Sequence, residues 1–179
     1  MLKSETSVLI IVDVQGKLAH RMHQKERLFE QLGKLIQGAQ VLSVPILWVE
    51  QNPEGLGPTI PEIADLLSDV EPIPKLSFSC CGCDRFVQAL RFLSRKQILI
   101  AGIETHVCVY QTAMDLLSSG YEIQIVADAV SSRTEENKQI GLSRIEDAGA
   151  TLTSTEMALF EMLKVAKGAQ FKEILNIVK

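Results

Sequence analysis

Short runs of hydrophobic residues alternate with longer amphipathic stretches from one end of the chain to the other. Val8 to Val12 is apolar at every position, which is typical of a strand buried on both faces of a parallel sheet. Residues 25–43 follow with apolar side chains at helical spacing, and Pro45 ends this predicted helix. The same alternation predicts strands at 46–49, just before 75, and at 97–101, 122–126 and 151–153, and helices at 63–67, 84–94, 105–119, 134–148, 156–164 and 171–178.

Regular alternation of strands and helices predicts an α/β fold with a doubly wound, Rossmann-like parallel sheet and helices on both faces. No repeat, low-complexity tract or linker divides the chain, so residues 1–179 are expected to form a single domain. Residues 51–61 are rich in Gly and Pro and are expected to be a loop, and Asp84 is expected to cap a helix. Ligands of such sheets bind beyond the carboxyl ends of the strands.

Charge and cysteine content narrow the classes of function. The net charge is −4 with no run of Lys or Arg, which argues against nucleic acid or an anionic membrane surface as a partner. The chain leaves no room for a signal peptide before Val8 and has no apolar stretch of the ~18 residues that a membrane span needs. Its four cysteines lack the spacing of a secreted disulfide framework. We therefore expect reduced thiols and a cytoplasmic location.

Three reactive residues follow predicted strands. Asp13 comes directly after the first apolar run, Lys75 follows a Pro-Ile-Pro segment, and Cys108 lies where a buried strand turns into a helix. Each has a simpler interpretation when taken alone. Asp13 suits a turn, Lys75 suits a surface position, and Cys108 suits a buried structural site.

Together, these residues supply a nucleophile, a base and a cation. The start of a helix favours thiolate over thiol, and its free N–H groups can bind the oxyanion of an acyl intermediate. A carboxylate such as Asp13 can accept the proton of Cys108 and later return it, while Lys75 can supply the nearby positive charge. The set predicts nucleophilic catalysis by Cys108.

Four segments carry a resemblance to a known family. Residues 9–15, Lys75 ahead of Phe78, residues 102–109 and residues 126–133 resemble the signature segments of the isochorismatase-like cysteine hydrolases, in order and over nearly the whole chain. Residues 51–59 and 171–174 resemble the isochorismatase domain-containing proteins within that family, whose substrates are generally unsettled.

The resemblance implies a role for each residue. Asp13, Lys75 and Cys108 match the catalytic triad, and the backbone N–H groups of Glu104 and Cys108 match the oxyanion hole. It also implies a cis peptide bond between Ile103 and Glu104. Nicotinamidases of this family bind a metal through an Asp and two His residues after the second strand. This chain has no His between His23 and His106, so neither a metal nor a cofactor is expected.

The surroundings of the site are less sharply defined by the sequence. We expect Gln15, Phe78 and His106 to line a pocket. His106 is two residues from Cys108, and neighbours at that spacing do not face each other on a helix, so it is a poor candidate base. Cys80 and Cys83 have the spacing of a redox pair, but a lone pair of this kind is a weak signal.

The leading hypothesis is a metal-independent cysteine hydrolase that cleaves a small amide or a related C–N or C–O bond through an acyl-enzyme. Three alternatives stay open: an enol ether hydrolase of the same family, a binding or scaffold protein that kept the fold, and a thiol-redox sensor. The apolar positions of residues 171–178 also suggest a packing face, so we expect a homo-oligomer that acts on a small molecule.

Overall fold

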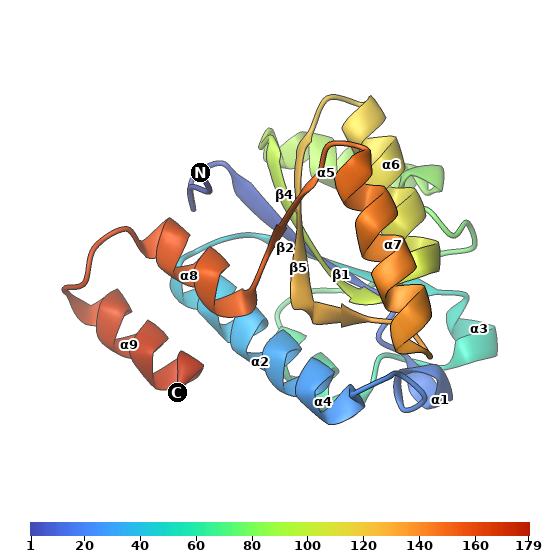
Figure 1. The fold of residues 1–179 in the computed structure, drawn as a ribbon, viewed down its shortest axis with the longest axis horizontal. Helices are drawn as coiled ribbons and strands as arrows, with labels where there is room; N and C mark the ends of the chain where they lie inside the picture. Colours follow the sequence, from blue (N-terminus) through green and yellow to red (C-terminus); the bar gives the residue numbers. More distant parts are fainter.

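The computed structural model describes residues 1–179, and a six-stranded parallel sheet lies at its centre (Figure 1). The order of the strands across the sheet is β3-β2-β1-β4-β5-β6. The chain adds strands towards one edge from β1 to β3 and towards the other edge from β4 to β6, so the switch point lies between β1 and β4. This confirms the doubly wound parallel sheet expected from the sequence. The strands are β1 (Ser7–Val12), β2 (Ile46–Gln51), β3 (Ile73–Lys75), β4 (Gln97–Ile103), β5 (Glu122–Ser131) and β6 (Thr151–Thr153).

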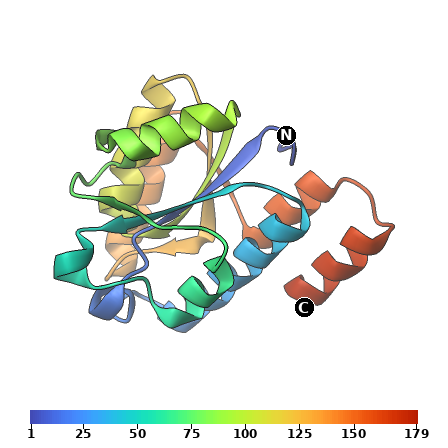
Figure 2. The same cartoon turned by 180° about the vertical axis from the view of Figure 1, so that it is seen from behind.

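Helices cover both faces of the sheet (Figures 1 and 2). Two hydrophobic cores, of 26 and 21 buried residues, lie between the sheet and these two helical layers. The first core involves α2 (Lys25–Val41), α4 (Pro61–Ala64), α8 (Thr155–Leu163) and α9 (Ala169–Val178), and the second involves α5 (Asp84–Leu93), α6 (Tyr110–Ser118) and α7 (Glu135–Asp147). The short helices are α1 (Gly16–Ala19), α3 (Pro53–Leu56), 3-10 turns at Asp65–Leu67 and Cys80–Gly82, and a π-helical turn at Thr105–Val109.

The central position of β1 in the sheet explains why its sequence does not alternate between apolar and polar residues. All six of its residues are buried, because β2 and β4 flank it and helices cover both of its faces. In the register of the sheet, Val12 lies beside Val49 on one side and Gly102 on the other. The residue after Val12 therefore emerges at the centre of the carboxyl edge.

Three local expectations were wrong. Strand β5 continues to Ser131 rather than ending at Val126, because a register shift lets Val130 and Ser131 pair with β4. Residues 51–61 contain the end of β2 and the short helix α3 rather than only a loop. Asp84 is the first residue of α5 and makes no capping bond, since Cys83 occupies the cap position.

The C-terminal helix α9 uses its apolar face within the chain. Ile174 is fully buried, and Ile177 and Val178 pack against the core that α2 and α8 share. Figure 2 shows α9, in red, beside α2. The apolar pattern at residues 171–178 therefore reflects, at least at these positions, packing onto the domain itself.

Gly102 is required where β4 passes the end of β1. Its φ is +113°, a conformation that residues with a side chain rarely adopt, and an added Cβ would overlap the backbone of Val12. This close approach brings the turn that follows β4 next to the residue that follows β1.

Replacement of Gly102 by Ala is expected to lower the free energy of unfolding by about 3 kcal/mol or more, because both the φ angle and the Val12 backbone oppose a Cβ. Gly120→Ala is the matched control. Gly120 also has a positive φ, of +81°, but an added Cβ would meet nothing within 4 Å, so only ~1 kcal/mol is expected. Urea unfolding of both variants measures the difference, and equal losses would contradict the steric role of Gly102.

Candidate active site

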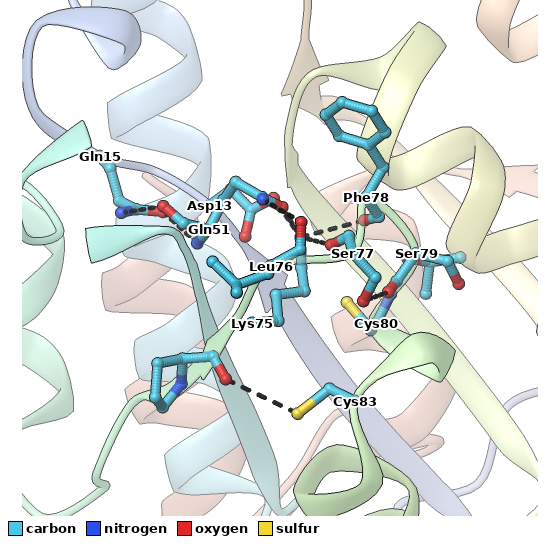
Figure 3. A network of polar contacts seen from close by, with 12 residues as sticks. Asp13, Gln15, Gln51, Lys75, Leu76, Ser77, Phe78, Ser79, Cys80 and Cys83 are labelled. Carbon is cyan, nitrogen blue, oxygen red and sulfur yellow. Dashed lines mark hydrogen bonds and ion pairs between the residues drawn. The ribbon is translucent and has the colours of Figure 1, made fainter. Parts of the chain in front are cut away.

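Asp13 and Lys75 form a buried ion pair at the carboxyl edge of the sheet (Figure 3). Asp13 follows β1 in a left-handed backbone conformation with φ of +53°, and Lys75 is the last residue of β3. The Lys75 Nζ donates a hydrogen bond to Asp13 Oδ2 at 2.8 Å. The side chain of Lys75 is 0% exposed and that of Asp13 is 2% exposed, so neither charge is solvated by bulk water. An ion pair buried this deeply needs further hydrogen-bond partners to be stable.

Those partners surround the ammonium group of Lys75. Its Nζ lies 2.6 Å from the side-chain oxygen of Gln51, 3.1 Å from the carbonyl of Ser77 and 3.0 Å from the carbonyl of Phe78. Gln51 was not among the residues expected at the site. It ends β2 directly beside Lys75 in the sheet register, and the sequence alone does not give that register.

Gln15 holds this end of β2 in place. Its side-chain amide donates to the carbonyls of Gln51 and Gly57 at 3.0 and 2.7 Å and accepts from the Gln51 N–H at 2.6 Å. Gln15 is fully buried and its side chain is occupied by backbone groups. It therefore positions Gln51 rather than lining a pocket, which differs from the expectation.

Cys108 lies in the π-helical turn that connects β4 to α6. The side chain is buried, with a residue exposure of 6%. Helix α7 packs closely on this turn: a Cβ at Gly141 would come within 3.0 Å of the backbone at His106. The turn is thus held between the sheet and α7, near enough to Asp13 for the carboxylate charge to raise the pKa of the Cys108 thiol.

The carboxylate of Asp13 has one oxygen left for the thiol. Oδ2 accepts from Lys75, whereas Oδ1 is buried and has no hydrogen-bond partner. Burial raises the pKa of Asp13, and the charge and hydrogen bond of Lys75 and the contact with Cys108 act in the opposite direction. Oδ1 is therefore the basic atom available to the thiol.

The same surroundings keep Cys108 protonated. Burial raises the pKa of its thiol, the charge of Asp13 raises it further, and Lys75 offsets only part of the effect. The raised pKa favours the neutral thiol over the thiolate that was expected at the start of a helix. A neutral thiol beside a carboxylate needs that carboxylate to accept its proton when it reacts.

Two backbone N–H groups of this turn, those of Glu104 and Cys108, lack the partner that a regular helix or strand would give them. The Glu104 carbonyl accepts from the N–H of Val107 at 3.0 Å and of Val109 at 3.2 Å, but not from Cys108, which a regular α-helix would pair with it. The N–H of Glu104 makes no bond to another backbone group. The peptide bond between Ile103 and Glu104 is cis.

Two further contacts hold this turn. The Glu104 carboxylate accepts from the backbone N–H and the Nε of Arg133, both at 3.1 Å. The Nδ1 of His106 lies 2.9 Å from the Ser132 hydroxyl. Phe78 places its carbonyl on Lys75 while its ring is largely exposed and points away from the ion pair (Figure 3). The rings of His106 and Phe78 are thus on the rim of the site rather than at the reacting atoms.

Residues near the end of β2 are hydrogen-bonded to Thr59 of the following segment. Glu50 accepts from the N–H and hydroxyl of Thr59 at 2.7 and 2.8 Å, and the Thr59 hydroxyl accepts from the Trp48 ring N–H at 2.8 Å. No group of three or more His, Cys, Asp or Glu side chains is arranged to hold a metal ion. No helix is both long and apolar enough to cross a membrane.

The remaining cysteines are free thiols. Cys80 is fully buried, and burial raises the pKa of its thiol to about 12. Cys81 is half-buried, and burial raises its pKa as well. Cys83 lies 3.6 Å from the Pro74 carbonyl through its sulfur (Figure 3). A redox pair needs a thiol that ionises readily, which the surroundings of Cys80 oppose.

The doubly wound fold and the buried Asp13–Lys75 pair at the carboxyl edge of its sheet define an α/β protein of the isochorismatase-like class. The profile of the family described as Isochorismatase domain matches residues 7–157, and the chain belongs to this family. The chain is 35% identical over 177 residues to isochorismatase domain-containing protein 2 of Xenopus laevis, an alignment that covers 99% of this chain and 85% of that protein. It is 36% identical to the secreted isochorismatase effector Isc1 of Phytophthora sojae, over 97% and 85% of the two chains.

Solved structures show the same architecture. The MAR1 ribonuclease of Caenorhabditis elegans superposes with a TM-score of 0.92 at 32% identity, over 99% of this chain and 91% of that chain. YcaC of Escherichia coli, described as an octameric hydrolase of unknown specificity, superposes with a TM-score of 0.93 at 22% identity, over 98% and 88%. At 22% identity, the similarity to YcaC shows the fold alone.

The buried thiols are expected to make stability fall as the pH rises above about 9. An exposed thiol in the unfolded chain has a pKa of about 9, and the buried thiol in the folded chain has a higher pKa. Between these two pKa values, the thiol keeps its proton in the folded chain and loses it in the unfolded chain, so the free energy of unfolding declines as the pH rises. Each such thiol contributes a slope approaching about 1.4 kcal/mol per pH unit. Urea unfolding between about pH 8 and pH 10 measures it.

Cys80→Ala and Cys108→Ala should each reduce this slope, whatever their effect on stability at neutral pH. Val109→Ala is the control, because it removes buried apolar atoms without removing a titrating group. If the two cysteine variants kept the full slope, the interpretation of neutral buried thiols would be wrong.

Proposed function

We propose that this protein is a metal-independent cysteine hydrolase that cleaves a small amide, or a related C–N or C–O bond, through an acyl-enzyme on Cys108. The observation that carries the proposal is the free Oδ1 of Asp13, buried beside Cys108 while Oδ2 is held by Lys75. Membership in the isochorismatase domain family supports the same reaction class.

The first half of the proposed reaction forms the acyl-enzyme. Asp13 Oδ1 accepts the thiol proton as the sulfur of Cys108 attacks the substrate carbonyl carbon. The carbonyl oxygen becomes an oxyanion, which the N–H groups of Glu104 and Cys108 stabilise. Collapse breaks the C–N or C–O bond, and Asp13 returns the proton to the departing amine or alcohol.

The second half releases the acid. Asp13 accepts a proton from a water molecule, the resulting hydroxide attacks the thioester carbonyl, and the C–S bond breaks with the proton returned to sulfur. In this scheme, the ion pair with Lys75 keeps the Asp13 side chain oriented while Asp13 gains and loses a proton. Gln51 positions Lys75 through the contact of 2.6 Å. No net proton or electron is gained, and the reaction consumes only water.

Cys108→Ala is expected to lower turnover of a cleaved amide by about a thousandfold or more, because no other group can form the covalent intermediate. Cys108→Ser should be similarly impaired, since Asp13 must then deprotonate a less acidic hydroxyl. The assay is a panel of small amides, esters and enol ethers followed by intact mass for an adduct of Cys108. Cys81→Ala, which removes a half-buried thiol outside the site, is the matched control.

The outcomes of this panel separate the competing functions. Full turnover in both Cys108 variants would refute the covalent mechanism, and turnover confined to enol ethers would favour the isochorismatase-type reaction. A tightly bound ligand that is never cleaved would favour a binding protein. RNA belongs in the panel because one similar structure is named a ribonuclease. We expect no RNA cleavage, given the net charge of −4.

We also propose that the protein forms a homo-oligomer in the cytoplasm. One structure with the same fold is described as octameric, and Leu76 and Phe78 expose 80% and 55% of their surface beside the site. Sedimentation at micromolar concentration should give a mass above 19.8 kDa, and Leu76→Ser with Phe78→Ser should lower it. Phe92→Ser, at another exposed apolar position, is the control, and a monomeric wild type would exclude the assembly.

A further inference from the structure

A cavity of about 370 Å³ lies beside the carboxyl-terminal part of β5, and none of the proposed catalytic residues lines it. Only three of its twelve lining residues are hydrophobic. Ser131 lines it and donates from its hydroxyl to the His23 carbonyl at 2.8 Å, whereas the next residue, Ser132, faces His106. The cavity and the catalytic site therefore lie on opposite sides of the end of β5.

Two cations face this cavity without a paired carboxylate. Arg27, from α2, and Lys138, from α7, line it, and neither lies within 4 Å of an acidic oxygen. Burial lowers the pKa of Lys138, and the charge of Arg27 lowers it further, while Asp128 and Glu135 act in the opposite direction. Arg27 and Lys138 thus repel each other across the cavity, and a bound anion would relieve that repulsion.

The two acidic residues of the cavity are partly occupied elsewhere. Asp128 Oδ1 accepts from the N–H and the hydroxyl of Thr155 at 2.8 and 3.0 Å. Glu135 Oε2 lies 3.5 Å from the His23 Nε2. The two groups lie at ion-pair distance, and no hydrogen bond joins them. These contacts leave Arg27 and Lys138 as the charges that lack a partner.

Three helices also begin at this cavity. Gln24 precedes α2, Glu135 is the first residue of α7, and Ser154 precedes α8, and all three residues line the cavity. The helices have 17, 13 and 9 residues, and the N-terminal end of each carries a partial positive charge. Figure 1 shows α2 and α7 on either side of β5. The helix ends add to the positive field that the two side chains create.

We propose that this cavity binds a phosphate group, either as free phosphate or as part of a small phosphate ester, between Arg27 and Lys138. The Arg27 guanidinium can donate two parallel hydrogen bonds to phosphate oxygens, and Lys138 can supply a second charge. The volume lies within the range of small-molecule sites, which leaves room for a small organic group on the phosphate. This proposal does not depend on the proposed hydrolase activity.

The test is calorimetric titration of the wild-type protein with inorganic phosphate and with glycerol 3-phosphate, against chloride at equal ionic strength. Saturable binding of either phosphate compound is expected, and the tighter one identifies the form that the cavity prefers. Arg27→Gln with Lys138→Gln should weaken binding at least tenfold. Lys17→Gln with Lys172→Gln removes the same charge at exposed positions that form no ion pair, and it should leave binding unchanged.

A second measurement uses only the wild-type chain, in case the double variant fails to fold. Mild acetylation followed by peptide mass spectrometry reports the modification of each lysine, and phosphate should protect Lys138 at least fivefold while Lys172 stays equally reactive. Absence of saturable binding, equal weakening in the control variant, or no protection of Lys138 would overturn the proposal.

Discussion

The buried ion pair between Asp13 and Lys75 is the constraint on which the site depends. Removing two such charges from water costs several kcal/mol for each ion, and their mutual attraction offsets this only when the remaining polar atoms are also satisfied. The structure meets this condition at Lys75, through Gln51 and two carbonyls, and leaves it unmet at one oxygen of Asp13. That single unsatisfied oxygen is where the proposed chemistry begins.

Much of the surrounding backbone serves to place these groups. Gly102 lets β4 pass close to Val12, the π-helical turn directs Cys108 towards Asp13, and α7 packs on that turn through Gly141. Such irregular features are frequent at functional sites, because they point groups where regular helices would not. The same burial raises the pKa of the Cys108 thiol, and the negative charge of Asp13 disfavours a thiolate further, so the proposed reaction assigns Asp13 the role of base.

The carboxyl edge of the sheet carries two sites of opposite character. Around Cys108 the groups are enclosed and nearly dry, which suits proton transfer and a covalent intermediate. On the other side of the end of β5, the cavity is polar and is lined by Arg27, Lys138 and two carboxylates beside three helix starts, and we propose it as a site for reversible binding of an anion. Both follow from the geometry of a doubly wound sheet, in which strand ends and helix starts gather at one edge.

The sequence by itself determined the sheet and most of its strands and helices, and it pointed to Asp13, Lys75 and Cys108 as the candidate reactive set, because uninterrupted apolar runs and polar residues at their ends are local patterns. Tertiary structure alone decided the roles of Gln51 and Gln15, the neutral state of Cys108 and the internal packing of α9. These depend on sheet register, burial and contacts between residues far apart in the chain. The cavity between Arg27 and Lys138 belongs to the same group, because the two residues are separated by more than half of the sequence and only the fold makes their charges repel.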